Sequence, residues 1–452
     1  MFKKFTNGCV KLVNKYLPDP FLFAIILTIV TFIGALIATG MGPIEVLSNW
    51  GADTGIWGLL SFAMQMVLVL VLGGAMASAN AVKKALNAIA SLAKTPRDGI
   101  MITAFVSAIF CWLNWGFGLI VGALLARAIA RRINGVDYRL LIASAYAGFV
   151  VWHAGTSGSI PLNLAGEGVL EKMSGGLLTG VVPSSETIFH PINLLISGVI
   201  IVGLPFLCWA MMPTAENTIT VDPALLVEKE AKTYKKDTPA EKMENSRILW
   251  LITIVLGFGY IVYYFVTKGF NLSLNVVNMI FLFLGILMHG NLRKYIDAIA
   301  DAAGGAAGII LQFPFYAGIM GLMVAKNEAG VSLAGVISNF FVSISNGLTY
   351  PLFTFWAAGI VNFFVPSGGG QWAVQGPIMM PATATLNVPA GQTAMAIAWG
   401  DAWTNMIQPF WALPALGIAG LSAKDIMGYC VVVTLATGIV ISGGMLLWAF
   451  LF

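Results

Sequence analysis

The stretch His153-Ala-Gly-Thr-Ser-Gly-Ser-Ile-Pro161-Leu162 lies between apolar segments, at a depth where a membrane-spanning helix should be hydrophobic. It contains glycines, hydroxyl side chains, a histidine and a proline. The interior of a bilayer has no water to satisfy free backbone groups, so non-helical backbone at that depth is buried in protein or lines a water-filled cavity. We therefore expect this stretch to be the floor of a binding site, unless it is a loop outside the membrane.

The composition is that of a membrane protein. Of the 452 residues, 58% are hydrophobic and 10% are charged, whereas soluble domains carry about 25% charged residues. The net charge of +4 is too small for a nucleic-acid-binding surface. The 3 histidines and 4 widely spaced cysteines do not suggest a metal centre. We predict an all-α polytopic membrane protein with neither a cofactor nor a bound metal.

A second polar interruption, Gly400–Pro409, lies in the C-terminal half of the chain. Paired interruptions at corresponding places of two halves are the best indication from sequence of a transporter binding site. We therefore predict two broken transmembrane helices, at 140–166 and 392–421.

The apolar residues 99–126 have basic residues on both flanks, and the positive-inside rule places both flanks in the cytoplasm. A run that begins and ends on one side is not a single span, and its length of about 28 residues is too short for two spans. We predict a re-entrant hairpin with its tip at 111–118, where Asn114 and two glycines interrupt the run. One long tilted span is the alternative.

A second hairpin is predicted at 349–386, where the sequence Val365-Pro366-Ser367-Gly-Gly-Gly-Gln-Trp372 interrupts another apolar run. No basic residue lies between Lys326 and Lys424, so the charge rule does not apply here. The glycine-rich tip and the short total length favour a hairpin that enters from outside.

The other apolar runs complete the expected order of elements. Full spans are expected at 21–39, 57–79, 189–212, 248–267, 273–290, 304–325 and 426–450, with interfacial helices at 81–93 and 331–346. Each half then contains spans, an interfacial helix, a hairpin, a broken helix and a span, in opposite orientations, which is an inverted-topology repeat. We divide the chain into a first membrane repeat (1–212), a cytoplasmic linker (213–247) and a second membrane repeat (248–452).

This topology places the N-terminus in the cytoplasm and the C-terminus in the periplasm. Of the 24 Lys and Arg residues, only Lys172, Lys268 and Lys326 fall outside. Such a bias toward the cytoplasmic side is expected of a correct topology.

Four tips should converge near the middle of the membrane, where half-helix N-termini favour anions and half-helix C-termini favour cations. The expected substrate-binding residues are Asn114, Trp115, His153, Gly155, Thr156, Ser157, Ser159, Ser367, Gly368, Gly369, Gln371, Trp372, Trp403, Thr404 and Asn405. The expected ligands of a coupling ion are Asn114, Thr156, Ser367, Asp401 and Asn405. The tryptophans at the tips could wall a small acyl chain or serve ordinary helix packing.

Asp401 is the only acid that we place at membrane depth, where acids are costly and mark ion or proton pathways. It could bind Na⁺, carry a proton, or accept a hydrogen bond from a backbone or indole N–H group. His153 could titrate near neutral pH if solvated, or remain neutral and hydrogen-bonded. No Lys or Arg lies at the tips, which suits a small monoanion better than a dianion.

The sequence Gly155-Thr156-Ser157-Gly158 also matches the GxSG motif of intramembrane serine proteases. Such an enzyme needs a histidine base on a neighbouring helix, and His190 and His289 are expected near span ends. An intramembrane serine hydrolase is therefore the alternative from another class, and a small-anion channel is a third.

These hairpin and break motifs, taken together, resemble those of the short-chain fatty acid transporter family, over essentially the whole chain. The resemblance rests on Asn114 and its neighbours, the break at 153–161, the tip at 366–372 and Gly400–Asn405. It implies a branch of the ion transporter superfamily with an elevator motion, a homodimer, and Na⁺ or H⁺ as the coupling ion. We expect cation-coupled import of acetoacetate, butyrate or a similar monocarboxylate across the bacterial inner membrane.

Overall fold

The computed structural model describes residues 20–226, 234, 237–270, 272–362, 365, 367–408 and 411–451. All regular elements in these ranges are helices, apart from one isolated antiparallel bridge between Lys326 and Ser332. Within the same ranges, 7 helical stretches are long and apolar enough to cross a membrane. The predicted all-α polytopic fold is confirmed.

The first half contains ten named α-helices and a long 3₁₀ segment. They are α2 (Pro20–Thr39), α3 (Pro43–Gly51), α4 (Leu60–Ala77), α5 (Asn80–Ala90), α6 (Pro96–Leu113), α7 (Trp115–Ala130), α8 (Tyr138–Ala147), η1 (Gly148–Ala154), α9 (Ser159–Leu164), α10 (Val169–Ser174) and α11 (Pro191–Ala210). Of these, α3 and α10 were not predicted from the sequence.

The second half follows the short helix α12 (Pro239–Glu244). Its helices are α13 (Arg247–Lys268), α14 (Leu274–His289), α15 (Leu292–Ala303), α16 (Ala307–Val324), α17 (Leu333–Ile344), α18 (Tyr350–Asn362), α19 (Gly368–Leu386), α20 (Ala390–Asn405), α21 (Leu413–Ala419) and α22 (Ala423–Leu451). The amphipathic helix α15 was also not predicted.

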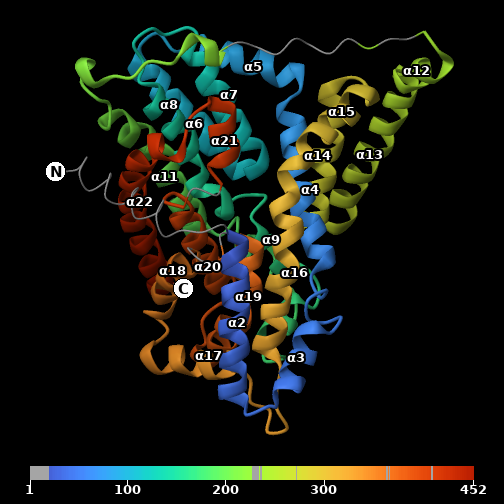
Figure 1. The fold of residues 1–452 in the computed structure, drawn as a ribbon, viewed down its shortest axis with the longest axis vertical. Coiled ribbons are helices and arrows are strands. Elements are labelled where there is room, and N and C mark those ends of the chain that lie inside the picture. The colour runs from blue at the N-terminus through green and yellow to red at the C-terminus, as the bar shows by residue number, and fades with distance from the viewer. Residues whose placement is uncertain are drawn as a thin grey trace.

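Packing between helices is reciprocal between the halves. Helix α2 packs on α16 while α14 packs on α4, and α5 packs on α7 while α17 packs on α19. Likewise α4 contacts α7 as α16 contacts α19. Figure 1 shows α5 and α15 at one end of the molecule and α3 and α17 at the other. These paired contacts are those of an inverted repeat. Helix α13 has no counterpart, and the division at 213–247 stays a prediction.

Glycines allow the first hairpin to close. A Cβ atom at Gly118 would lie 2.3 Å from the Cys111 backbone nitrogen, and one at Gly122 would lie 2.6 Å from Ser107 Oγ. Helices α6 and α7 therefore approach through their backbones. The turn is at Asn114, whose Oδ1 accepts a hydrogen bond from Phe117 N (2.9 Å) and caps α7. Helices α6 and α7 form a helical hairpin that extends beyond 99–126 at both ends, and its re-entry from one side of the membrane stays a prediction.

One boundary was predicted wrongly. Residues 400–405 were expected to be non-helical, but α20 continues to Asn405 and the interruption follows it. Gly400 does not end the helix. It leaves room for α18, because a Cβ atom there would lie 2.4 Å from Phe355 O. Pro366 of the second predicted tip and Pro409 of the second predicted break lie outside the described residues, as do residues 1–19.

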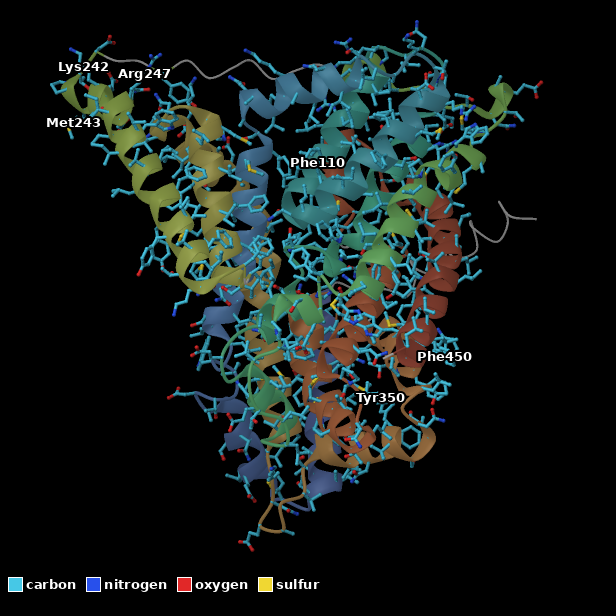
Figure 2. The ribbon with its side chains drawn as sticks, turned by 180° about the vertical axis from the view of Figure 1, so that it is seen from behind. Phe110, Lys242, Met243, Arg247, Tyr350 and Phe450 are labelled. Carbon is cyan, nitrogen blue, oxygen red and sulfur yellow. The ribbon has the colours of Figure 1, made fainter. Side chains whose placement is uncertain are left out.

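Basic side chains gather at one end of the molecule. Figure 2 shows Lys242 and Arg247 at the end that also carries α12, while Tyr350 lies in the opposite half. The α5 lysines, Lys83 and Lys84, lie at the same end as α12 (Figure 1). Such an asymmetry sets the orientation of a membrane protein.

Candidate functional site

The first hairpin tip is hydrogen-bonded to the first helix break. Thr156 N donates to Trp112 O (2.8 Å), and Trp115 N donates to Ser157 Oγ (2.9 Å). Gly155 permits this contact, because a Cβ atom there would lie 1.8 Å from Trp112 O. Backbone groups freed by the hairpin turn are thereby satisfied inside the protein.

His153 lies at the centre of the site, between the two halves. Its Nδ1 lies 2.8 Å from Asp401 Oδ2, and both side chains are fully buried. On the other side of the ring, Ile160 N donates to Nε2 (3.1 Å), and Ser159 Oγ lies 3.0 Å from the same nitrogen. A backbone N–H group only donates, so Nε2 must accept and Nδ1 carries the ring proton. His153 therefore donates to the Asp401 carboxylate.

Asp401 has a second oxygen with no hydrogen bond. Its Oδ1 is buried and has no protein partner among the residues that the structure describes. A buried carboxylate is costly unless it is paired and its oxygens are satisfied. One neutral imidazole N–H group cannot balance a full negative charge, so this oxygen is the strongest candidate in the site for a cation or a proton.

A chain of hydrogen bonds through Asn405 and Asn362 joins the end of α20 to η1 of the first half and α18 of the second. Trp152 Nε1 donates to Asn405 Oδ1 (3.0 Å), and Asn405 Nδ2 donates to Asn362 Oδ1 (3.0 Å). Asn362 Nδ2 in turn donates to Thr404 Oγ1 (2.9 Å). Thr404 and Asn405 thus have structural partners, and their side chains hold α18, α20 and η1 together.

The second hairpin tip lies directly against His153. A Cβ atom at Gly368 would lie 2.3 Å from His153 Cε1 and 2.7 Å from Ser159 Oγ. The next glycine, Gly369, lies against Phe62 of α4 and Phe313 of α16. Ser367 caps α19 through a hydrogen bond from Gly370 N to its Oγ (3.4 Å). The structure therefore brings both tips, the first break and the end of α20 together.

Some predicted site residues face elsewhere. Trp403 Nε1 donates to Thr434 O on α22, and its ring packs on Gly438. Gln371 Nε2 donates to Ala358 O and to Gln375 Oε1. Trp372 Nε1 donates to Asn163 Oδ1 on α9 (2.9 Å). These side chains serve helix packing around the tips.

Three asparagines of the site were not predicted from the sequence: Asn163, Asn193 and Asn362. Asn193 of α11 donates to Ala154 O and accepts from Trp399 Nε1 (2.9 Å). The available signal was that Asn193 and Asn362 are isolated polar residues within long apolar runs. A buried amide in such a run usually has a specific hydrogen-bond partner.

The contacts Ser159–His153–Asp401 have the order of a serine hydrolase triad. Ser157, the serine of the GxSG motif, accepts from Trp115 N, whereas the described hydrogen-bond partners of the His153 ring are Asp401, Ser159 and Ile160. Ser159 is 1% exposed, and the Gly368 backbone covers the imidazole. Because Ile160 N also donates to Nε2, that nitrogen is a poor general base.

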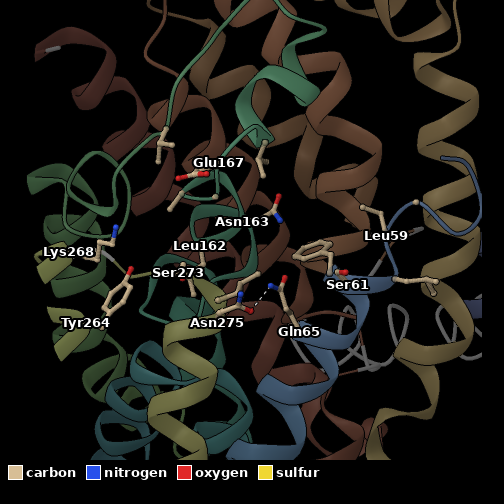
Figure 3. Close-up of a pocket in the computed structure, with 18 of the residues that line it drawn as sticks. Leu59, Ser61, Gln65, Leu162, Asn163, Glu167, Tyr264, Lys268, Ser273 and Asn275 are labelled. Carbon is tan, nitrogen blue, oxygen red and sulfur yellow. Dashed lines mark hydrogen bonds between the residues drawn. The ribbon is translucent and has the colours of Figure 1, made fainter. Parts of the chain in front are cut away.

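A cavity of about 730 Å³ adjoins the second tip. Figure 3 shows Lys268 and Tyr264 on one wall, Leu59 and Ser61 on the opposite wall, and Asn163 between them. Phe62 and Leu162 also line it. Its volume lies within the range of small-molecule sites.

The family model for short-chain fatty acid transporters matches residues 1–448. The chain belongs to the short-chain fatty acid transporter family. It is therefore a multi-pass membrane transporter and not an enzyme, which settles the alternative based on the GxSG motif.

Two relatives of this family member match it along almost their whole lengths, and each of them is named a putative short-chain fatty acid transporter. The protein from Escherichia coli (strain K12) is 44% identical over 451 residues, covering 99% of this chain and 100% of the relative. The protein from Haemophilus influenzae (strain ATCC 51907 / DSM 11121 / KW20 / Rd) is 45% identical over 443 residues, covering 97% and 98%.

Among solved structures, the YdaH transporter of Alcanivorax borkumensis is similar to this family member, with a TM-score of 0.61. The alignment covers 96% of this chain and 98% of that one, at 16% identity. The two proteins share a fold, and so distant a relationship says nothing further about substrate.

Proposed function

We propose that the protein is a secondary active transporter that imports short-chain monocarboxylates, such as acetoacetate or butyrate, across the bacterial inner membrane. The names of both close relatives support the substrate class. The observation that carries the coupling proposal is the buried Asp401 carboxylate, whose Oδ1 has no protein partner among the described residues. A cation that binds at that oxygen and crosses the membrane down its gradient, together with the substrate, would drive accumulation of the acid.

The coupling ion is Na⁺ or H⁺, and Asp401 is its principal ligand in this proposal. Among the other expected ligands, Asn405 has both side-chain polar atoms engaged, by Trp152 and Asn362. Asn114 keeps a buried Nδ2 with no partner in the described ranges, and that atom is a donor suited to an anion. We therefore assign Asn114 to the substrate carboxylate and Asp401 to the cation.

The direct test is uptake of labelled butyrate or acetoacetate by proteoliposomes with the Na⁺ and proton gradients imposed separately. Accumulation driven by one gradient identifies the ion. Failure of both gradients to drive any accumulation contradicts the proposal. Counterflow, in which internal substrate speeds the entrance of labelled external substrate, separates a carrier from a small-anion channel.

We propose that transport follows an elevator motion within a homodimer, with both hairpins moving and α4 and α16 static. Both tips press on these two helices: a Cβ atom at Gly116 would lie 2.9 Å from Val69 O, and Gly370 lies against Tyr316. Such close, weakly polar contacts suit a sliding surface. The exposed apolar side chains of α13, including Val255 and Val266, are available to lipid or to a second copy. Chemical crosslinking in membranes tests the dimer.

The basic end of the molecule is cytoplasmic in this proposal, with the N-terminus cytoplasmic and the C-terminus periplasmic. Arg97 lies in the first turn of α6, and Arg131 directly follows α7, so the two residues flank the first hairpin. Cysteines placed at 97 and 131 should both react with a membrane-impermeant reagent from the cytoplasmic side only. Labelling from opposite sides would contradict the hairpin.

Replacement of Asn114 by aspartate tests its role. Aspartate keeps the oxygen that caps α7 but replaces the free N–H₂ donor by a second acceptor with a negative charge. We expect the variant to fold and its uptake to fall by about tenfold or more, because repelling a carboxylate costs at least about 1.4 kcal/mol at close range in a buried site. Serine at 114 also caps α7 and serves as the uncharged control. Normal uptake by N114D would show that Asn114 does not bind the substrate carboxylate.

A further inference from the structure

The cavity of about 730 Å³ is lined by residues of α4, α9, α13 and α14. Its lining includes Lys268, at the opposite end of α13 from Arg247, which Figure 2 shows at the basic end. A crevice that only held lipid tails would be lined by apolar side chains, but this cavity also has polar and charged ones. Its polar lining residues come from four helices and the loops beside them: Ser61, Gln65, Asn163, Glu167, Lys268, Ser273 and Asn275. A cavity of this size with several polar partners is able to hold water.

The floor of the cavity adjoins the second hairpin tip. Asn163 lines the cavity and accepts a hydrogen bond from Trp372 Nε1 (2.9 Å). Phe62 lines it too, and lies against Gly369 of the same tip. Phe62 and Asn163 therefore stand between the cavity and the second tip, and that tip in turn lies against His153.

The orientation of the Asn163 amide is fixed by its partner. An indole N–H group only donates, so Oδ1 of Asn163 must face Trp372 and the N–H₂ group must point away from it. No hydrogen bond engages that group within the described parts of the chain. It is a donor available to a carboxylate.

Lys268 supplies the positive charge. It ends α13 on the cavity wall and forms no ion pair with any described residue. A fixed positive charge in a cleft with low-dielectric walls concentrates anions there. The nearby Glu167, which lines the same cavity, opposes this effect.

We propose that this cavity is an outer vestibule that collects the substrate carboxylate, with Lys268 attracting it and the Asn163 amide donating to it beside Trp372. The vestibule rests on the proposed carboxylate transport. It is a site distinct from the tips, whose residues carry no Lys or Arg. Because Lys268 and Glu167 have opposite charges, removing one charge should change the KM for the substrate in the opposite direction from removing the other.

The test is the KM for uptake of labelled butyrate by intact cells, measured over a range of external concentrations. Lys268→Gln should raise KM about three- to tenfold and leave the maximal rate within about twofold. Glu167→Gln should lower KM. Asn163→Asp, which keeps the acceptor for Trp372, should raise KM. Lys326→Gln, at another lysine on the same side, is the matched control and should change nothing.

A chemical version avoids dependence on any one variant. Lys268→Cys should regain a low KM after reaction with a positively charged, membrane-impermeant thiosulfonate, and should lose further affinity with a sulfonate analogue. The described native cysteines are buried, which limits background reaction. Unchanged KM in the Lys268, Glu167 and Asn163 variants of a protein that transports butyrate would overturn the vestibule. Absence of butyrate uptake by the unmodified protein would instead overturn the proposed function.

Discussion

Replacing Asp401 by asparagine should abolish gradient-driven accumulation of substrate while leaving the fold intact. The amide oxygen can still accept the hydrogen bond from His153 Nδ1, so the contact at 2.8 Å is retained. The charge that the unpartnered Oδ1 presents is lost. Removing a buried charge from its ion costs about 3 kcal/mol or more, which corresponds to a fall of about 100-fold in coupled uptake.

Two assays on reconstituted protein separate coupling from misfolding. The melting temperature in detergent should stay within a few degrees of the unmodified value, and uphill accumulation under an imposed ion gradient should disappear. Asp425→Asn is the control, because Asp425 is a partly exposed acid that accepts from Ser422 at the start of α22. Accumulation by D401N at the level of this control would show that the coupling ion binds elsewhere.

Replacing Gly368 by alanine should also stop transport, for a steric reason. Its Cβ would lie 2.3 Å from His153 Cε1 and 2.7 Å from Ser159 Oγ, both rigidly held atoms in a buried cluster. The tip must withdraw or the imidazole must turn away from Asp401. Overpacking of this kind costs about 1–3 kcal/mol, and displacing the tip from His153 should reduce uptake by at least about tenfold.

Gly198 provides the matched control for that substitution. It lies inside α11, and a Cβ atom there meets nothing within 4 Å. Gly198→Ala should transport normally and be as stable as the unmodified protein, since alanine favours a helix interior. Equal uptake by G368A and G198A would mean that the tip does not need its close contact with His153.

The main architecture was predictable because the bilayer restricts it strongly. Basic residues on both flanks of the apolar run 99–126 were enough to predict a hairpin. The chain turns at Asn114, as expected. The polar break at His153 was recognisable because it interrupts an apolar run. Positive-inside bias and span length are properties of local sequence, so they can be read without knowing the contacts.

The hydrogen-bond partners were not predictable in the same way. Sequence indicated that His153 and Asp401 were unusual, but they are 248 residues apart. Only the folded chain shows that the imidazole bonds this carboxylate and leaves Oδ1 free. The end of α20 was missed because Gly400 resembles a helix breaker, whereas its role is the close approach of Phe355. Glycine's two uses, flexibility and lack of volume, look alike in a sequence.

The reciprocal packing of the two halves has a thermodynamic consequence. The first hairpin packs on α4 through α7 as the second packs on α16 through α19, so a motion of both hairpins that exchanged these two sets of contacts would give a molecule of similar shape that opens to the other side. Two such states should differ little in free energy when no substrate is bound. In any secondary transporter the ratio of acid inside to acid outside, together with the ion gradient, sets the net direction. States of nearly equal free energy would let this one work with similar ease in both directions, so it could release acid from the cell as readily as take it up.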